Sequence, residues 1–331
     1  MDRQPWKVVI TDLDEGVTDE VKNVLTRRGV DLVCEQVKKE EDLIRVCREA
    51  DGIITQYAQM TRAVLEHLPE CKVVVRYGVG VDNVDLKAAT ELGIVVANVP
   101  DYCTEEVADH TIALWLTLIR KTILYDRKVK SGLWDFREGR PICRLRGKVM
   151  GIVGCGRVGT AVAKRVQAFG VRVIGNDPFI EKASEGIELT DLDTILRESD
   201  FISIHCSLNE TSRHLIGEKE FKRMKKKPIL LNTARGPVVH EKALITALRQ
   251  NLISGAGIDV METEPPDPNN PLLKMGNVIL SPHVAFFSEQ SLSELKRRVA
   301  EIAVEVLSGK WPRSVVNPEV KGKTRASILD L

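Results

Sequence analysis

Short apolar runs alternate with amphipathic segments along the first hundred residues of the chain. The runs typical of buried strands lie at residues 7–10, 30–34, 52–55, 72–75 and 94–97. The segments with apolar residues at helical spacing lie between them, at residues 18–28, 40–50, 61–67 and 85–92. Thr18 is placed to cap the first of these helices, and Gly29 to end it. Strands that alternate with helices in this way predict a parallel sheet covered on both faces.

The same alternation returns after residue 148. Strands are expected at residues 149–153, 171–175, 201–205, 229–231, 254–260 and 278–280. Helices are expected at residues 157–169, 192–198, 218–224, 242–250 and 289–307. The pattern therefore predicts a second parallel α/β domain. Only this second domain has a glycine-rich turn directly after its first strand.

Between the two sets, residues 104–130 are expected to form one long helical stretch, with or without a break. Its middle, ALWLTLI at residues 113–119, is apolar around most of the helix surface. A helix of this kind is buried, here either between domains or against another subunit. The polar and aromatic segment that follows, residues 132–146, is expected to be an excursion without a core of its own.

The glycine-rich turn reads Gly154-Cys155-Gly156-Arg157-Val158-Gly159, a GxGxxG between a strand and a helix. Gly154 permits a tight turn, Gly156 lets a pyrophosphate approach the backbone, and Gly159 lets the helix pack closely on the strand. The unpaired N–H groups at the start of that helix suit a diphosphate. Asp177 follows the next strand and could accept hydrogen bonds from a ribose. A glycine turn in an ordinary sheet is the alternative, but the flanking elements favour a dinucleotide site, and the acid favours NAD over NADP.

The composition narrows the choice of partners. The chain has 331 residues and a net charge of +1, so we expect neither a nucleic acid nor an anionic membrane as partner. Its seven cysteines are scattered and never in CxxC spacing, which indicates a reducing compartment and no zinc site. The four acids at residues 101, 105, 106 and 109 are explained by the dipole at a helix start, so no metal is expected. Because no signal peptide or membrane span is visible, a cytoplasmic protein is predicted.

Three side chains with complementary chemistry follow predicted strand ends, where ligands bind in open α/β sheets. They are Arg235, Glu264 and His283. A guanidinium can hold carboxylate and carbonyl oxygens, an imidazole can exchange a proton near neutrality, and a carboxylate beside it favours the imidazolium. Taken singly, Arg235 is better explained as a structural ion-pair residue and Glu264 as a loop acid, but their occurrence together at this spacing favours catalysis. The histidines at 67, 110, 205 and 214 lack a partner pattern and are expected to be structural or surface residues.

These motifs resemble those of the D-isomer-specific 2-hydroxyacid dehydrogenases over nearly the whole chain. The resemblance implies catalytic roles for Arg235, Glu264 and His283, with a small 2-hydroxy or 2-oxo acid as substrate. It implies substrate contacts in RYGVGVDNVD, from Arg76 and the backbone of Val79 and Gly80, and from Arg235. The implied NAD-binding residues are Gly154, Gly156, Arg157, Val158, Gly159, Asp177, Cys206, Thr233, Ala234, Arg235, Asp259 and His283. Cys206 is expected to offer its backbone, because no base for a nucleophilic thiol can be identified.

The family fold has two doubly wound parallel-sheet domains, a Rossmann cofactor domain inserted into a flavodoxin-like substrate domain. The expected substrate domain comprises residues 1–98 plus 285–331, and the cofactor domain residues 99–284. Within the family, VPDYCTEEVADHT, HCSLNE and FFSEQ resemble the branch that contains the C-terminal-binding-protein corepressors, which bind NAD and act through partner proteins. An NAD(H)-responsive binding protein is therefore the alternative function. Phe286 stands where that branch has a tryptophan.

Two positions depart from the family pattern. Gln56 occupies a position where the phosphoglycerate enzymes carry an arginine for the phosphate, so the choice between a hydroxypyruvate or glyoxylate type of substrate and 3-phosphoglycerate stays open. His240 replaces the usual aspartate and is expected to be a poorer helix cap.

The apolar surface of residues 104–146 predicts a homodimer through this region. The family resemblance implies the same, because family members pair through the cofactor domain.

Overall fold

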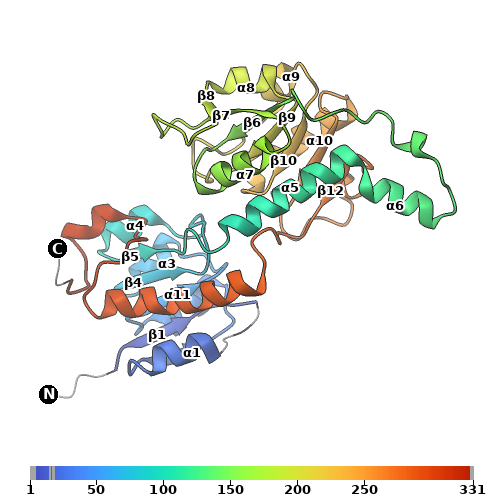
Figure 1. Ribbon diagram of the computed structural model, residues 1–331. Coiled ribbons are helices and arrows are strands. Elements are labelled where there is room, and N and C mark those ends of the chain that lie inside the picture. The colour runs from blue at the N-terminus through green and yellow to red at the C-terminus, as the bar shows by residue number, and fades with distance from the viewer. Residues whose placement is uncertain (1–4, 15, 17–18, 329–331) are drawn as a thin grey trace. The chain divides into compact units, whose positions relative to one another are not determined.

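The computed structural model of the protein describes residues 5–14, 16 and 19–328. It divides into two compact units, one comprising the residues up to Tyr102 together with those from Ser288 onward, and the other comprising Cys103–Phe287 (Figure 1). We expected the boundaries after residues 98 and 284. The middle part of the chain thus forms one unit between two segments that fold together.

The first unit contains a five-stranded parallel sheet in the order β2-β1-β3-β4-β5. Its strands are β1 (Lys7–Ile10), β2 (Asp31–Cys34), β3 (Gly52–Thr55), β4 (Val73–Arg76) and β5 (Val95–Ala97). Its helices are α1 (Asp19–Thr26), α2 (Glu40–Cys47), α3 (Arg62–Glu66), α4 (Leu86–Glu91) and α11 (Glu289–Leu307). This strand order is that of flavodoxin-like sheets. The expected cap at Thr18 lies outside the described residues, whereas Thr61 and Asp85 cap α3 and α4 through their side chains.

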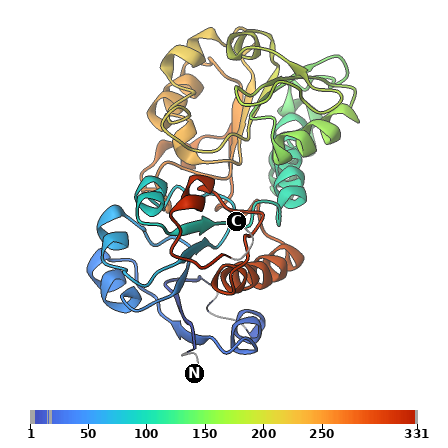
Figure 2. The same cartoon turned by 90° about the vertical axis from the view of Figure 1, so that its left-hand side faces the viewer.

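The C-terminal segment completes the first unit, although it is about 200 residues distant in sequence from the strands it covers. Helix α11 packs on β3, β4 and α1, and the chain then runs beside β5 (Figure 2). The side chain of Asn317, just before η4 (Pro318–Gly322), accepts a hydrogen bond from the N–H of Val96 at 2.8 Å and donates one to the carbonyl of Ile94 at 3.0 Å. The edge strand is therefore covered by the returning chain.

The second unit contains a seven-stranded parallel sheet in the order β12-β11-β10-β9-β6-β7-β8. Its strands are β6 (Val149–Val153), β7 (Arg172–Asn176), β8 (Glu188–Leu189), β9 (Phe201–Ile204), β10 (Ile229–Asn232), β11 (Gly255–Ile258) and β12 (Val278–Leu280). The order reverses between β6 and β9, which is where ligands bind in Rossmann sheets. The two-residue strand β8 was not expected from the sequence. Both parallel sheets confirm the predicted fold class.

The helices of the second unit are α5 (Thr104–Arg120), α6 (Thr122–Lys130), α7 (Arg157–Gln167), α8 (Leu192–Glu198), α9 (Glu218–Arg223) and α10 (Glu241–Arg249), with short 3₁₀ turns η1 (Phe136–Gly139), η2 (Gly236–Val238) and η3 (Pro271–Lys274). Lys121 is left-handed (φ 55°), so the expected long helix breaks there into α5 and α6. Helix α5 packs on α7, β10 and β11. Trp115 is fully buried, with Phe169 and Phe201 edge-on at 5.4 Å. Much of the apolar surface of α5 is therefore covered inside its own unit.

Candidate functional site

In the second unit, the predicted cofactor and catalytic residues follow the carboxyl ends of successive strands. The glycine turn follows β6, Asp177 follows β7, and Cys206 follows β9. Thr233 and Arg235 follow β10. The loop that carries Asp259 and Glu264 follows β11, and the loop that carries His283 follows β12. Because the strands are parallel and in register, these groups lie along one edge of the sheet.

The glycine turn has the geometry that a bound pyrophosphate requires. Gly154 has φ +92°, and a Cβ built on it would lie 2.5 Å from the backbone nitrogen of Cys206. A Cβ on Gly159 would collide with the carbonyl of Gly154, so only glycine lets α7 pack this closely. Among the described residues, a Cβ on Gly156 would meet no atom within 4 Å apart from its own chain neighbours, and no side chain caps α7. The first N–H groups of α7 therefore fit a diphosphate such as that of NAD.

Asp177 links the glycine turn to the next strand. Its Oδ2 accepts a hydrogen bond from the N–H of Cys155 at 3.0 Å, and its Oδ1 accepts one from the N–H of Phe179 at 3.0 Å. Each oxygen keeps further lone-pair capacity, and the side chain is partly exposed. The carboxylate is therefore already oriented, and its contact with the adenosine ribose stays a prediction.

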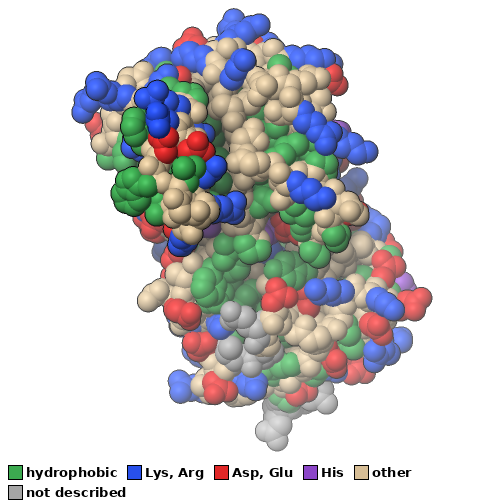
Figure 3. Space-filling model, turned by 90° about the vertical axis from the view of Figure 1, so that its right-hand side faces the viewer, with side chains coloured by type: hydrophobic (Ala, Val, Ile, Leu, Met, Phe, Trp, Pro, Cys, Tyr) green, Lys and Arg blue, Asp and Glu red, His purple; other side chains and the backbone are tan. Residues whose placement is uncertain are grey.

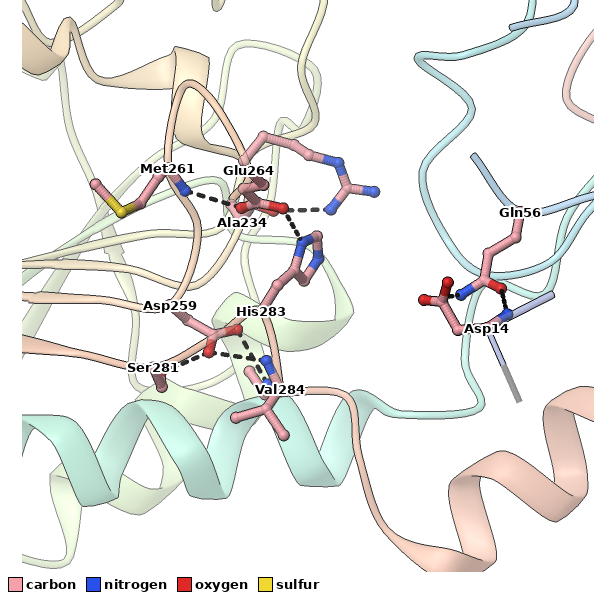
Figure 4. A network of polar contacts seen from close by, with 11 residues as sticks. Asp14, Gln56, Ala234, Asp259, Met261, Glu264, Ser281, His283 and Val284 are labelled. Atoms are coloured by element: carbon pink, nitrogen blue, oxygen red, sulfur yellow. Dashed lines mark hydrogen bonds and ion pairs between the residues drawn. The ribbon is translucent and has the colours of Figure 1, made fainter. Parts of the chain in front are cut away.

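Glu264 and His283 form the pair that the resemblance predicted, with Nδ1 of His283 2.7 Å from Oε2 of Glu264 (Figure 4). The other carboxylate oxygen accepts the N–H of Met261 at 2.9 Å. Partial burial alone would raise the pKa of Glu264, but the hydrogen bond and charge of His283, the Met261 N–H and the Arg235 guanidinium together lower it. Because Nδ1 faces Glu264, Nε2 is the ring atom of His283 that can exchange a proton with a substrate.

Arg235 begins the turn after β10 and precedes η2, where Gly236 has no room for a Cβ against the backbone of Met261. Its guanidinium donates to the carbonyl of Ala234 at 2.8 Å through Nη1. The Asn232 side chain accepts the Ala234 N–H at 3.1 Å and donates to the carbonyl of Arg235 at 2.9 Å, which fixes the local backbone. The planar guanidinium is thus held on the same edge as the Glu264–His283 pair.

Asp259 is almost fully buried, with 2% of its surface exposed. Its carboxylate accepts hydrogen bonds from the N–H groups of Val284 and Ala285, both at 3.0 Å, and from Oγ of Ser281 at 2.6 Å (Figure 4). Its carbonyl accepts the N–H of His283 at 2.8 Å. The structure therefore shows Asp259 holding the histidine loop, and its contact with NAD stays a prediction.

The sequence interpretation missed His110 and Ser281. His110 was expected to be structural or a surface residue, yet its Nε2 lies 2.8 Å from Oγ of Ser281 and 3.6 Å from Oδ1 of Asp259. No local pattern could have indicated this, because the two hydrogen-bonded residues are 171 positions apart in the sequence.

Burial shifts the pKa values of Cys206 and His205. Burial raises the pKa of Cys206 to about 11 and the charge of Asp177 adds to it, so the side chain stays a thiol at neutral pH. Burial lowers the pKa of His205 to about 3, so its ring is neutral there. His240, expected to be a poorer cap than aspartate, caps α10 with Nδ1 accepting the N–H of Ala243 at 3.2 Å.

In the first unit, the side chain of Gln56 is held by Asp14, a residue to which the sequence analysis gave no role. Its Oε1 accepts the N–H of Asp14 at 2.9 Å, and its Nε2 lies 3.4 Å from Oδ2 of the same residue (Figure 4). Burial raises the pKa of the adjacent Tyr57 to about 12, and the charge of Asp14 adds to this rise. A carboxylate, an amide and a neutral phenol therefore gather at the carboxyl ends of β1 and β3.

The predicted substrate loop follows β4. Arg76 is the last residue of that strand, and Val79 is 40% exposed. The carbonyl of Val79 accepts a hydrogen bond from Nδ2 of Asn98 at 2.6 Å, which fixes the peptide unit that joins Val79 to Gly80. The loop is thus anchored through a carbonyl.

Comparison with known proteins gives the family. Residues 112–285 match the sequence model of the D-isomer specific 2-hydroxyacid dehydrogenase, NAD binding domain. The chain is 40% identical over 286 residues to a glyoxylate reductase of Korarchaeum cryptofilum, covering 84% of this chain and 86% of that protein. It is 38% identical to a D-3-phosphoglycerate dehydrogenase of Archaeoglobus fulgidus, covering 92% of this chain but only 58% of that longer protein. The structure of an NADPH-dependent glyoxylate/hydroxypyruvate reductase from Sinorhizobium meliloti superimposes with a TM-score of 0.85 at 29% identity, covering 96% of this chain and 98% of that one.

These relatives are all named as reductases or dehydrogenases, which favours the enzymatic interpretation over the corepressor-like alternative. Among the described residues, no helix combines the length and apolar character needed to cross a membrane. The glycine turn, the acid after β7 and the Arg–Glu–His set all follow strands of one Rossmann sheet. The chain is therefore a member of the D-isomer specific 2-hydroxyacid dehydrogenases, NAD-dependent oxidoreductases of D-2-hydroxy acids.

Proposed function

We propose that the protein reduces a small, unphosphorylated 2-oxo acid of the glyoxylate or hydroxypyruvate type to the D-2-hydroxy acid, with NADH as cofactor. The observation that carries this proposal is the 2.7 Å contact between His283 and Glu264, on the sheet edge that also holds Arg235 and the glycine turn. An acid–base pair, a guanidinium and a diphosphate site on one edge are the groups that hydride transfer to a carbonyl needs.

NADH, held at the glycine turn and Asp177, would supply the hydride that the carbonyl carbon receives. In our proposal, Arg235 binds the substrate carboxylate and polarises the carbonyl oxygen, since a guanidinium offers several donors in one plane. His283 donates the proton on Nε2 to that oxygen as the carbonyl π electrons move onto it. Glu264 holds Nδ1–H and stabilises the imidazolium before transfer. The 2-oxo acid thereby gains one hydride and one proton, and His283 is left neutral.

The first unit supports the substrate class. The N–H groups of Val79 and Gly80 would bind the substrate carboxylate, with Arg76 close by in sequence. The acid at Asp14 lies against Gln56, where the phosphoglycerate enzymes that the chain resembles carry an arginine. A phosphate there would face a carboxylate in place of a second guanidinium, which costs affinity. The hydrogen atom of glyoxylate and the hydroxymethyl group of hydroxypyruvate carry no charge, so they would meet no such penalty.

The test is a panel of 2-oxo acids with the purified protein and NADH. Glyoxylate, hydroxypyruvate, pyruvate, 2-oxoglutarate and phosphohydroxypyruvate are followed by the loss of NADH absorbance. Turnover in the usual enzymatic range of about 1–10³ s⁻¹ on glyoxylate or hydroxypyruvate supports the proposal. The His283→Ala variant should lose roughly 10²–10⁴-fold in kcat while NADH binding is kept. Tight NADH binding without oxidation by any member of the panel would instead favour the NAD(H)-responsive binding protein.

We also propose that the protein is a homodimer through residues 104–146. The projecting part of this region, residues 122–146, which we call the arm, has one buried residue, Gly139 (Figure 1). Its exposed apolar side chains are Ile123, Val129, Leu133, Trp134 and Phe136, with Trp134 87% exposed. Figure 3 faces the arm and shows hydrophobic side chains at its surface among lysines and arginines. Apolar surface of this extent is typical of an interface, and a two-fold dimer is its commonest form.

The arm is held in shape by contacts of its own, which supports a defined interface. The hydroxyl of Tyr125 donates to the carbonyl of Phe136 at 2.7 Å, and Lys128 pairs with Glu138 at 2.9 Å. Among the described residues, none of the seven cysteines forms a disulfide, which supports a reducing compartment, and we place the protein in the cytoplasm on that ground.

A further inference from the structure

A chain of three side chains joins helix α5 to the loop that carries His283. Nε2 of His110 lies 2.8 Å from Oγ of Ser281, and that hydroxyl donates to Oδ1 of Asp259 at 2.6 Å. Asp259 is 2% exposed, so this contact is sheltered from water. His110 comes from the first half of α5, Asp259 follows β11, and Ser281 follows β12.

The direction of these hydrogen bonds follows from the donors available. A serine hydroxyl has one proton, and here it is given to the Asp259 carboxylate. The oxygen of Ser281 must therefore accept from His110, which requires a proton on Nε2 of the imidazole. A side chain without a donor in place of His110 would remove the hydrogen bond that the Ser281 oxygen accepts. The Ser281 hydroxyl would then be held only by its bond to Asp259.

The loop that Ser281 begins needs to be held. His283 has φ +53°, a left-handed conformation that costs a non-glycine residue free energy and persists only where the surroundings impose it. Asp259 imposes it by accepting three consecutive N–H groups, that of His283 on its carbonyl and those of Val284 and Ala285 on its carboxylate. Any rotation of the Asp259 carboxylate would therefore move the backbone of His283 and its 2.7 Å contact with Glu264.

Helix α5 is a firm support for this chain of contacts. The next residue, Thr111, is fully buried, donates its hydroxyl to the carbonyl of Val107 at 2.7 Å, and lies 2.8 Å from the hydroxyl of Thr233 after β10. The helix is thus tied to the same sheet edge one residue away from His110.

We propose that His110 is a positioning residue for the reaction: through Ser281 and Asp259 it fixes the orientation of His283 relative to Glu264. It touches neither substrate nor the reacting atoms. This inference rests on the role of His283 proposed above. It adds a side chain that lies on a different element from the Arg235, Glu264 and His283 set.

The test compares His110→Gln, whose amide Nε2 can donate to Ser281, with His110→Leu, which cannot donate. Ser281→Ala and the double variant His110→Leu/Ser281→Ala complete a mutant cycle. His67→Leu is the matched control, because His67 belongs to the first unit, where its Nδ1 lies 2.7 Å from the carbonyl of Ala63 in α3. Each variant is first checked for cooperative unfolding and for NADH affinity by fluorescence.

We expect His110→Leu and Ser281→Ala each to lower kcat by roughly tenfold, with NADH affinity within about twofold of the wild type. The double variant should lose no more than either single variant, because the two side chains act in series. His110→Gln should recover most of the activity. Equal kcat for the wild type, the Leu and the Gln variants would overturn the inference, as would equal loss in Gln and Leu.

A second measurement keeps the inference separate from the proposed function. The environment of the His283 ring is followed by NMR with histidine labelled at Cε1, and the resonance is assigned with His283→Gln. If the Glu264 contact loosens, this resonance should shift in His110→Leu relative to the wild type, and His110→Gln should restore it. This holds even if no 2-oxo acid is reduced. Identical His283 resonances in all three would show that His110 does not position His283.

Discussion

The carbonyl of Asp259 accepts the N–H of His283 at 2.8 Å, while the carboxylate of the same residue accepts the next two N–H groups of the loop. A residue predicted to contact NAD thus also sets the left-handed backbone of the proposed acid–base histidine. Because the loop is preorganised in this way, the imidazole would need no reorganisation for the proposed proton transfer.

Replacing Glu264 by Gln should shift the pH dependence of reduction. The pKa of Glu264 is lowered, so its carboxylate stays ionised across the neutral and mildly acidic range and stabilises the imidazolium of His283. Reduction needs a proton on His283, so kcat/KM should fall as the pH rises. Without the negative charge of Glu264 this fall should come at lower pH than in the wild type. Profiles of kcat/KM for the 2-oxo acid from pH 5 to 9 measure this shift, and superimposable profiles would remove Glu264 from the mechanism.

Replacing Asp177 by Ala should relax the preference for NADH. The carboxylate is partly exposed and oriented by the N–H groups of Cys155 and Phe179, so a 2′-phosphate would meet its negative charge. The wild type should use NADPH poorly, and the variant should narrow the ratio of the two kcat/KM values by roughly tenfold or more. Equal efficiency of NADH and NADPH in the wild type would contradict this prediction.

Changing Gln56 to Arg together with Asp14 to Asn should improve the use of phosphohydroxypyruvate relative to hydroxypyruvate. The change removes the carboxylate that lies against Gln56 and adds a guanidinium that can bind a phosphate. A rise of roughly tenfold or more in the ratio of kcat/KM values is expected. The single variant Asp14→Asn is the control for loss of charge alone. An unchanged ratio in the double variant would mean that these residues do not contact the substrate side chain.

The double variant Trp134→Ser/Phe136→Ser should weaken the proposed dimer. The two rings are 87% and 70% exposed on the arm, and their removal takes apolar area from the interface. Light scattering should give twice 36.9 kDa for the wild type and a concentration-dependent fall toward 36.9 kDa for the variant. Phe179→Ser is the matched control, since this ring is 80% exposed but lies outside the arm. A wild-type mass of 36.9 kDa at all concentrations would contradict the dimer.

Local patterns in the sequence were sufficient for the fold class and for the steric geometry of the glycine turn. The GxGxxG at residues 154–159 and Asp177 lie within one βαβ unit, where strand, turn and helix follow one another along the chain. The steric reasons for Gly154 and Gly159 hold in the structure, because each contact involves backbone close to the turn. The break at Lys121 and the two-residue strand β8 were not predicted as such, since short or irregular elements leave little periodicity in a sequence.

The sequence by itself determined which residues follow each strand, and in a parallel sheet the carboxyl ends of the strands lie at one edge. Only the tertiary structure decided which of these side chains contact one another. The contact of His110 with Ser281 spans 171 positions, and that of Asp14 with Gln56 spans 42. Such hydrogen bonds need atoms that packing holds in place to within a few tenths of an ångström, and the hydrophobic pattern of the sequence does not reveal them. For this reason the sequence indicates only that His110 lies in a helix, whereas the folded chain shows its contact with the histidine loop.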